Sequence, residues 1–215
     1  RTSGTLAIIL FCVCIIGVIF SPILIIIFAP GFYDEQGDQV DRYNLAIKML
    51  RFTFPYLLFI SLTAFAGAIL NTKKHFWATA FNPVILNLVL IIAAGYIAPN
   101  SANPGLVLAF AVFLAGLFQL IFLFPFLRKI KRLPKPKWGW KDTGVNRVIK
   151  LMIPSIIGSS ASQINLLFNT LIASFLTAGS ISWIYYSDRL LEFPIGVFSV
   201  ALSTVVLPSL SRKSA

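Results

Sequence analysis

Long apolar runs, separated by short polar segments, make up most of this sequence. A helix of about 20 apolar residues, rising about 1.5 Å per residue, crosses a hydrocarbon layer about 30 Å thick. Six runs reach this length, and we predict six membrane-spanning helices over residues 5–29, 52–70 (with a start near 45 as the alternative), 76–98, 105–127, 151–176 and 181–207. The pattern therefore predicts an all-α, polytopic membrane helix bundle.

Composition supports the membrane class. Hydrophobic residues make up 58% of the 215 residues and charged residues 12%, whereas soluble domains carry about 25% charged residues. These proportions exclude a soluble globule, a disordered tail and a disulfide-stapled secreted scaffold. The net charge of +11 would suit a nucleic-acid binder, but the basic residues lie between apolar runs, so we expect no nucleic-acid partner.

Few residues suit metal or catalytic chemistry. Cys12 and Cys14 are two apart in an apolar run, and His75 follows two lysines in a short loop, so no metal-ligand spacing arises. The sequence has no GxxxxGK[ST] phosphate loop, no GxSxG elbow and no HExxH motif. We expect no enzyme, no cofactor and no metal site. Any transport would use an ion gradient, the membrane potential or the substrate's own gradient.

The charges between the runs indicate which side of the membrane each segment faces. With the N-terminus in the cytoplasm and six crossings, the cytoplasmic segments hold 14 of the 18 Lys and Arg residues, nine of them in segment 128–150. Arg42, Lys48 and Arg51 fall on the outer side. The positive-inside rule favours this orientation. Lys48 and Arg51 either snorkel to the surface or guide an anion.

Segment 128–150 divides the chain into two parts. We predict four helices ending a first lobe in 1–127, a basic cytoplasmic or interfacial linker in 128–150, and the first two helices of a second lobe in 151–215. Trp138 and Trp140 lie beside lysines, which suits either a solvated loop or docking on the headgroups of membrane lipids. The sequence opens without Met and closes after an apolar run, so we expect a part of a longer protein.

Three ionisable side chains interrupt the sixth run: Asp188, Arg189 and Glu192. A charge near the bilayer centre costs about 3 kcal/mol, so each needs a partner or a polar cavity. Arg189 and Glu192 are three residues apart and share a helix face, so they can pair. Either this end of the helix snorkels into the headgroups, or the guanidinium faces an internal cavity. A cavity would suit an anionic substrate, because guanidinium binds phosphate oxygens in pairs. Arg189, Glu192 and Asp188 are therefore the candidate substrate-binding residues.

The fifth run carries a polar stripe. Small hydroxyls permit close helix packing, whereas amides suit a cavity wall or a cation. The candidate cavity-lining residues are Ser162, Gln163, Asn165 and Asn169. Pro154 in this run and Pro194 after the charged motif remove backbone hydrogen bonds and are candidate hinges. In the third run, we predict that Asn82 and Pro83 serve kinking and packing.

Several motifs resemble the MurJ (MviN) family of lipid II flippases. The shorter ones are Phe54-Pro55-Tyr56, Gly67-Ala68-Ile69-Leu70-Asn71, Phe81-Asn82-Pro83 with Asn87, Pro154, Ser162-Gln163-Ile164, Asn169-Thr170 and Ala173-Ser174-Phe175-Leu176. The most similar is the sixth-run motif, which runs from Ser182-Trp183 through Tyr185-Tyr186-Ser187-Asp188-Arg189-Leu190 to Glu192-Phe193-Pro194. The similarity covers essentially the whole chain.

The resemblance implies the multidrug/oligosaccharidyl-lipid/polysaccharide exporter superfamily, whose members have about fourteen helices in two lobes around a cationic cavity. This chain would be the third to eighth helices, and Arg189 would be the family's essential arginine of the eighth. The implied function is translocation of lipid II across the bacterial inner membrane by alternating access, with Arg189 at the diphosphate. Cell-wall synthesis machinery is a further candidate partner.

Three alternatives to this function stay open. One is a flippase for another lipid-linked oligosaccharide. Another is a drug exporter of the same superfamily, for which acidic rather than basic cavity residues are expected. The last is a non-transporting membrane scaffold of cell-wall synthesis, which would tolerate the loss of Arg189.

Overall fold

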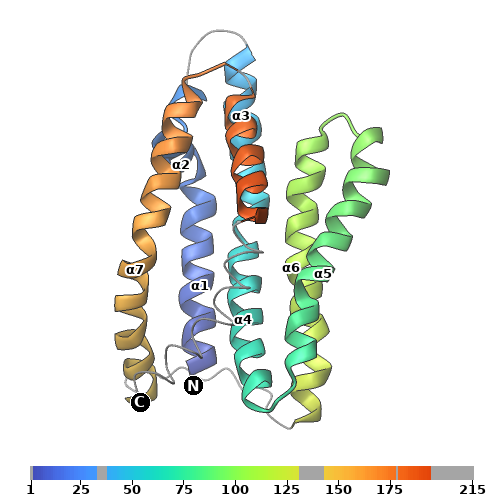
Figure 1. Cartoon of the computed structure of the whole chain (residues 1–215), viewed down its shortest axis with the longest axis vertical. Coiled ribbons are helices and arrows are strands. Elements are labelled where there is room, and N and C mark those ends of the chain that lie inside the picture. Colours follow the sequence, from blue (N-terminus) through green and yellow to red (C-terminus); the bar gives the residue numbers. More distant parts are fainter. Residues whose placement is uncertain (1, 33–37, 131–142, 178, 195–215) are drawn as a thin grey trace.

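The computed structural model describes residues 2–32, 38–130, 143–177 and 179–194, and every regular element in them is helical (Figure 1). The elements are α1 (Thr2–Ile19), α2 (Ser21–Phe28), η1 (Pro30–Phe32), α3 (Asp38–Thr53), α4 (Tyr56–Thr72), α5 (Phe76–Ile92), η2 (Ala93–Ile97), η3 (Ala98–Asn100), α6 (Pro104–Lys129) and α7 (Thr143–Ser174). Residues 180–194 form a further helix. The all-α prediction is confirmed.

Three helices in the described residues are long and apolar enough to cross a membrane: Asp41–Thr72, Phe76–Asn100 and Pro104–Lys129. Two bent pairs raise the number to five when each pair is taken as one span. The first pair is Gly4–Ile19 with Ser21–Phe28, and the second is Lys150–Ser160 with Gln163–Ser174. The sixth predicted run, 181–207, lies only partly within the described residues.

The first span is not the continuous helix expected over 5–29. Its two parts meet at 74°, immediately before Pro22. Proline supplies no N–H to the preceding turn, and its ring clashes with the carbonyl four residues back, so the helix axis turns there. Backbone bonds still continue on both sides, because Phe20 N–H donates to Ile16 and Leu24 N–H donates to Phe20.

Two predicted helix starts were too late. The second span begins at Asp41 rather than at 52 or 45, and α7 begins at Thr143 rather than at 151. Both additional stretches of helix contain polar side chains, so a search for apolar runs did not include them. In the second span one of these polar side chains forms a hydrogen bond to α2: Tyr43 Oη donates to the Pro22 carbonyl at 3.3 Å. Within segment 128–150, residues 131–142 lie outside the described residues, so the linker tryptophans are not placed.

Helix α6 packs against α3, α4 and α5, and the α3–α4 crossing lies between α6 and α1. Small residues bring the helices close, as is typical of membrane bundles. The buried cluster at their meeting point consists of Ala66, Leu70, Ala78, Leu123 and Leu127. Many large apolar side chains point outward, among them Phe11, Ile91 and Phe124, which gives a surface suited to lipid rather than water.

The crossings alternate in direction. Figure 1 places the α4–α5 turn and the end of α6 at one end of the molecule, and η1, the α5–α6 turn and the end of α7 at the other. The first end carries Lys73, Lys74, Arg128 and Lys129. The alternation used to predict topology is therefore present in the fold.

Candidate functional site

The sixth-run motif forms one continuous helix, and its arginine is held by two neighbours. Arg189 Nη1 donates to Glu192 Oε2 at 2.7 Å, and Arg189 Nε donates to Tyr185 Oη at 3.2 Å. The guanidinium carbon also lies 5.1 Å from the centre of the Tyr185 ring. The predicted i, i+3 pair is present, because residues three and four apart share a helix face.

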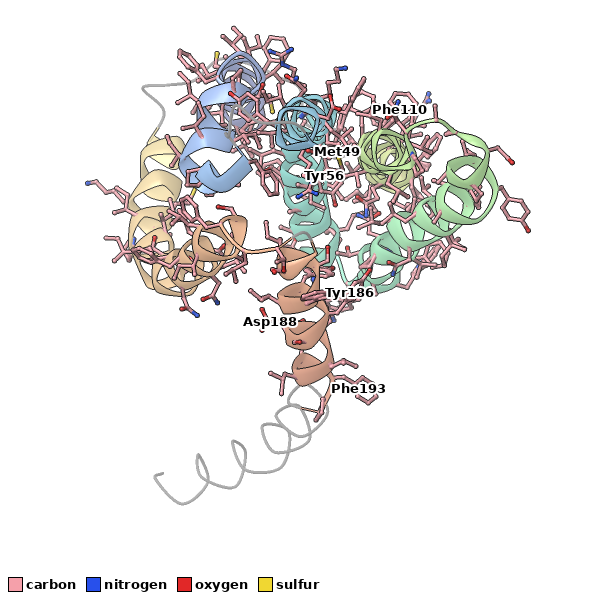
Figure 2. The ribbon with its side chains drawn as sticks, turned by 90° about the horizontal axis from the view of Figure 1, so that it is seen from above. Met49, Tyr56, Phe110, Tyr186, Asp188 and Phe193 are labelled. Atoms are coloured by element: carbon pink, nitrogen blue, oxygen red, sulfur yellow. The ribbon has the colours of Figure 1, made fainter. Side chains whose placement is uncertain are left out.

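Both members of this pair are exposed in the chain: the side chains of Arg189 and Glu192 are 60% and 65% accessible. Figure 2 shows Tyr186 and Asp188 on opposite sides of the same helix, and Asp188 lies one turn before Glu192. Apart from Ser180, Ile181 and Ile184, the residues of this helix are exposed, with Trp183 at 63% and Phe193 at 76%. The residues after Pro194 lie outside the described part, so a kink there is not placed.

The polar stripe of α7 divides into two kinds of side chain. Ser155 Oγ donates to the Leu151 carbonyl, and Ser159 Oγ donates to the Ile156 carbonyl, so these hydroxyls bond within their own helix. Gln163 and Asn165 are exposed and Asn169 is partly exposed. The side chain of Ser162 is outside the described set. The 43° bend in this helix falls between Ser160 and Gln163, after Pro154.

A contact that the sequence gave no reason to expect joins the two parts of the chain. Gly31 N–H, in η1, donates to Ser174 Oγ, at the end of α7, at 3.1 Å. The approach is so close that a Cβ added at Gly31 would collide with the Ser174 carbonyl and would lie 2.7 Å from Phe175 N. Only glycine fits here, because the opposing atoms are backbone and have little freedom to move.

A cavity of about 690 Å³ adjoins this contact. It is lined by the end of α2, by η1, by Arg42 of α3, by the end of α7 and by residues 179–182. Ser174 and Ser180, which are among the lining residues, are buried. The cavity does not include Arg189, which lies farther along the 180–194 helix.

A second hydrogen bond joins the first crossing (α1 and α2) to the second (α3 and α4). Arg51, four residues before Pro55, donates through Nε to Ser21 Oγ at 3.0 Å, and Ser21 is fully buried at the α1–α2 bend. From the sequence alone we expected Arg51 either to snorkel or to guide an anion, and this hydrogen bond to Ser21 was not predicted. Both residues lie close before a proline, which marks them in the sequence, but nothing in the sequence indicates that Ser21 and Arg51 contact each other.

Comparison with known proteins decides the family. The family model described as lipid II flippase MurJ matches residues 1–215. The chain belongs to the MurJ family. A probable lipid II flippase MurJ of Vibrio cholerae serotype O1 is 50% identical over 216 residues, covering 99% of this chain and 41% of the relative. The probable lipid II flippase MurJ of Haemophilus influenzae is 47% identical over 215 residues, covering 99% and 42%.

The similarity extends to the lipid II flippase MurJ of Burkholderia cenocepacia, which is 39% identical over 202 residues, or 92% of this chain and 38% of the relative. This MurJ-family chain therefore spans about two fifths of the length of the curated relatives it matches. Its apolar helices make it a multi-pass membrane chain, and flippases are transporters rather than enzymes. The resemblance read from the motifs is confirmed.

Proposed function

We propose that the full-length protein translocates a lipid-linked, diphosphate-bearing peptidoglycan precursor, lipid II, across the bacterial inner membrane by alternating access. The observation that carries this proposal is the match of the lipid II flippase family to all 215 residues, spans and connecting segments alike. Flippases of other lipid-linked oligosaccharides and scaffolds of cell-wall synthesis are the outcomes that the experiment below separates from it.

In this proposal Arg189 binds the diphosphate. Tyr185 and Glu192 occupy its Nε and Nη1 atoms and fix the plane of the guanidinium, so we assign Nη2 to the phosphate oxygens. Glu192 keeps the charge partly compensated while no substrate is bound, which lowers the cost of a cation in the membrane. Asp188 and the amides of Gln163, Asn165 and Asn169 would line the path of the sugar and peptide.

The movement required is a separation of the two parts of the chain at Gly31 and Ser174. At this end α7 contacts η1 and α2, so the contact closes one face of the assembly. Lys73, Lys74, Arg128 and Lys129 lie at the opposite end, which the positive-inside rule assigns to the cytoplasm. The closed face is then the periplasmic one, and the N-terminus and linker 128–150 are cytoplasmic. Pro154 and Pro194 are the proposed hinges.

The experiment is complementation of a strain depleted of its own flippase, with the full-length protein carrying Arg189→Ala or Arg189→Lys. We expect both variants to reach the membrane and fail to support cell-wall synthesis, since lysine lacks the planar guanidinium that contacts Tyr185, Glu192 and a phosphate at the same time. Arg128→Ala, at the exposed end of α6, is the matched control and should complement. A scaffold would tolerate Arg189→Ala, and growth of that variant at normal membrane levels would overturn the proposal.

The lipid itself is tested in vesicles. Wild-type full-length protein should expose labelled lipid II on the opposite leaflet, and Arg189→Ala should reduce that rate. If the wild-type protein moves a different lipid-linked oligosaccharide but leaves lipid II in place, that oligosaccharide is the substrate. The proposed role of Arg189 would then stay unchanged.

A further inference from the structure

A polar layer lies inside the packing of α4, α5 and α6. Gln119 of α6 is 2% exposed and donates through Nε2 to the backbone carbonyl of Asn82 in α5 at 3.0 Å. Asn82 itself is 7% exposed, and Thr63 of α4 is 3% exposed. Three polar side chains from three helices are thus almost completely removed from the surface.

Four side-chain oxygens in this region are buried without a hydrogen-bond partner among the described residues. They are Thr63 Oγ1, Thr79 Oγ1, Asn82 Oδ1 and Gln119 Oε1. A buried polar atom that lacks a partner costs about 1–3 kcal/mol, and native structures rarely leave one so. Four such atoms at one meeting point of helices point to a bound group that they share.

The register of the helices places these oxygens in neighbouring turns. The α4–α5 turn makes the two helices antiparallel, and a Cβ added at Gly67 would lie 2.8 Å from Thr79 Cγ2, so these two residues face each other. One turn back along α4 comes Thr63, and one turn on along α5 comes Asn82, which Gln119 already contacts. The apolar cluster with Leu123 and Ala78 closes the layer on one side.

Pro83 adds a fifth oxygen. It lies inside α5 and supplies no N–H to the carbonyl of Thr79, four residues earlier. Backbone carbonyls released from helical hydrogen bonds are groups with which transporters coordinate sodium. The layer therefore combines one freed backbone carbonyl, two side-chain amide oxygens and two hydroxyl oxygens, all uncharged.

We propose that this layer binds a monovalent cation of the size of sodium, holding α4, α5 and α6 together. Divalent calcium and magnesium take carboxylates, and the described residues contain no cluster of acidic, histidine or cysteine ligands. The freed Thr79 carbonyl, Asn82 Oδ1 and Gln119 Oε1 only accept hydrogen bonds. A single water has two hydrogens for these three acceptors, whereas a cation serves all of them together with the hydroxyls.

The test uses the purified full-length protein and the isosteric double variant Thr63→Val/Thr79→Val, which removes two ligand oxygens and keeps the side-chain shape. The matched control is Thr72→Val, whose hydroxyl bonds to the Ile69 carbonyl at the exposed end of α4. Binding of radioactive sodium and thermal unfolding are measured in sodium, potassium and choline chloride at equal ionic strength. The difference between the double variant and the control reports this layer alone, whatever other ions the full-length protein binds.

We expect the control to bind one more sodium per molecule than the double variant, or to bind that sodium roughly 10- to 100-fold more tightly. The control should also gain more thermal stability from sodium than from choline, and the double variant should lose that difference. Equal sodium binding in the two variants overturns the proposal. So does an equal loss of stability in all three salts, which would indicate a buried water. Should the double variant fail to fold, Thr63→Val alone carries the same comparison.

This inference stands apart from the proposed function. The sodium measurements use no lipid substrate and leave Arg189 unchanged, so their failure would leave the flippase proposal intact. Conversely, a protein that binds sodium in this layer but moves no lipid would refute the flippase proposal only.

Discussion

Adding one methyl group at Gly31 tests whether the two parts of the chain must separate. In Gly31→Ala the new Cβ would collide with the Ser174 carbonyl and come within 2.7 Å of Phe175 N. Both opposing groups are backbone, so η1 and α7 must move apart for the alanine to fit. Overpacking of this kind costs about 1–3 kcal/mol. On the proposed mechanism, the variant should therefore shift the balance from the closed to the open state of this face by roughly 5- to 150-fold.

The assay is the rate at which a membrane-impermeant maleimide, added from the periplasmic side, labels a cysteine placed at Ser180. Ser180 lines the cavity beside the contact and is 7% exposed, so labelling requires the face to open. We expect Gly31→Ala to speed labelling in the full-length protein. Gly158→Ala is the matched control, because a Cβ at Gly158 meets nothing within 4 Å. Equal rates in wild type, Gly31→Ala and Gly158→Ala would refute the closed-face reasoning.

Two further predictions rest on the packing and a third on the topology. Ser21→Ala removes the acceptor of Arg51 and should lower the free energy of unfolding by about 1.5–3 kcal/mol, whereas Ser155→Ala, whose hydroxyl bonds within its own helix, should change it little in the same unfolding assay. Leu123→Ala empties a fully buried site and should cost about 2–5 kcal/mol, in contrast to Ile121→Ala at a 56% exposed position; equal costs would place the core elsewhere. Cysteines at Lys74 and Asn100 should be labelled only from the cytoplasmic and only from the periplasmic side, and the reverse result would invert the topology.

The sequence predicted what depends on local pattern. Apolar runs of membrane length gave the crossings from α4 to α6, because a bilayer demands a fixed length of apolar helix. The spacing of Arg189 and Glu192 gave their pairing, because three residues bring two side chains to one helix face. The 74° bend also had a local signal in Pro22, which a long apolar run obscured.

Contacts between distant segments could not be predicted in the same way. Gly31 and Ser174 are 143 positions apart, and nothing near either residue indicates the other. Part of the polar layer around Gln119 had a signal in the sequence, because Asn82 and Pro83 are irregular for a membrane helix. Gln119 was the missed signal, because a single amide in an otherwise apolar helix needs a buried partner. The roles of Arg189, Glu192 and Asp188 toward a substrate stay predictions.

The elbow between α1 and α2 decides where the first crossing delivers the chain. Helix α1, with 18 residues, rises about 27 Å, which nearly uses up the hydrocarbon thickness. The eight residues of α2, turned by 74°, add only about 3 Å of height but carry the backbone about 11 Å sideways. That sideways course brings α2 against α7 and delivers Gly31 to Ser174. In a straight first crossing the same eight residues would extend out of the membrane. Gly31 and Ser174 would then not come into contact.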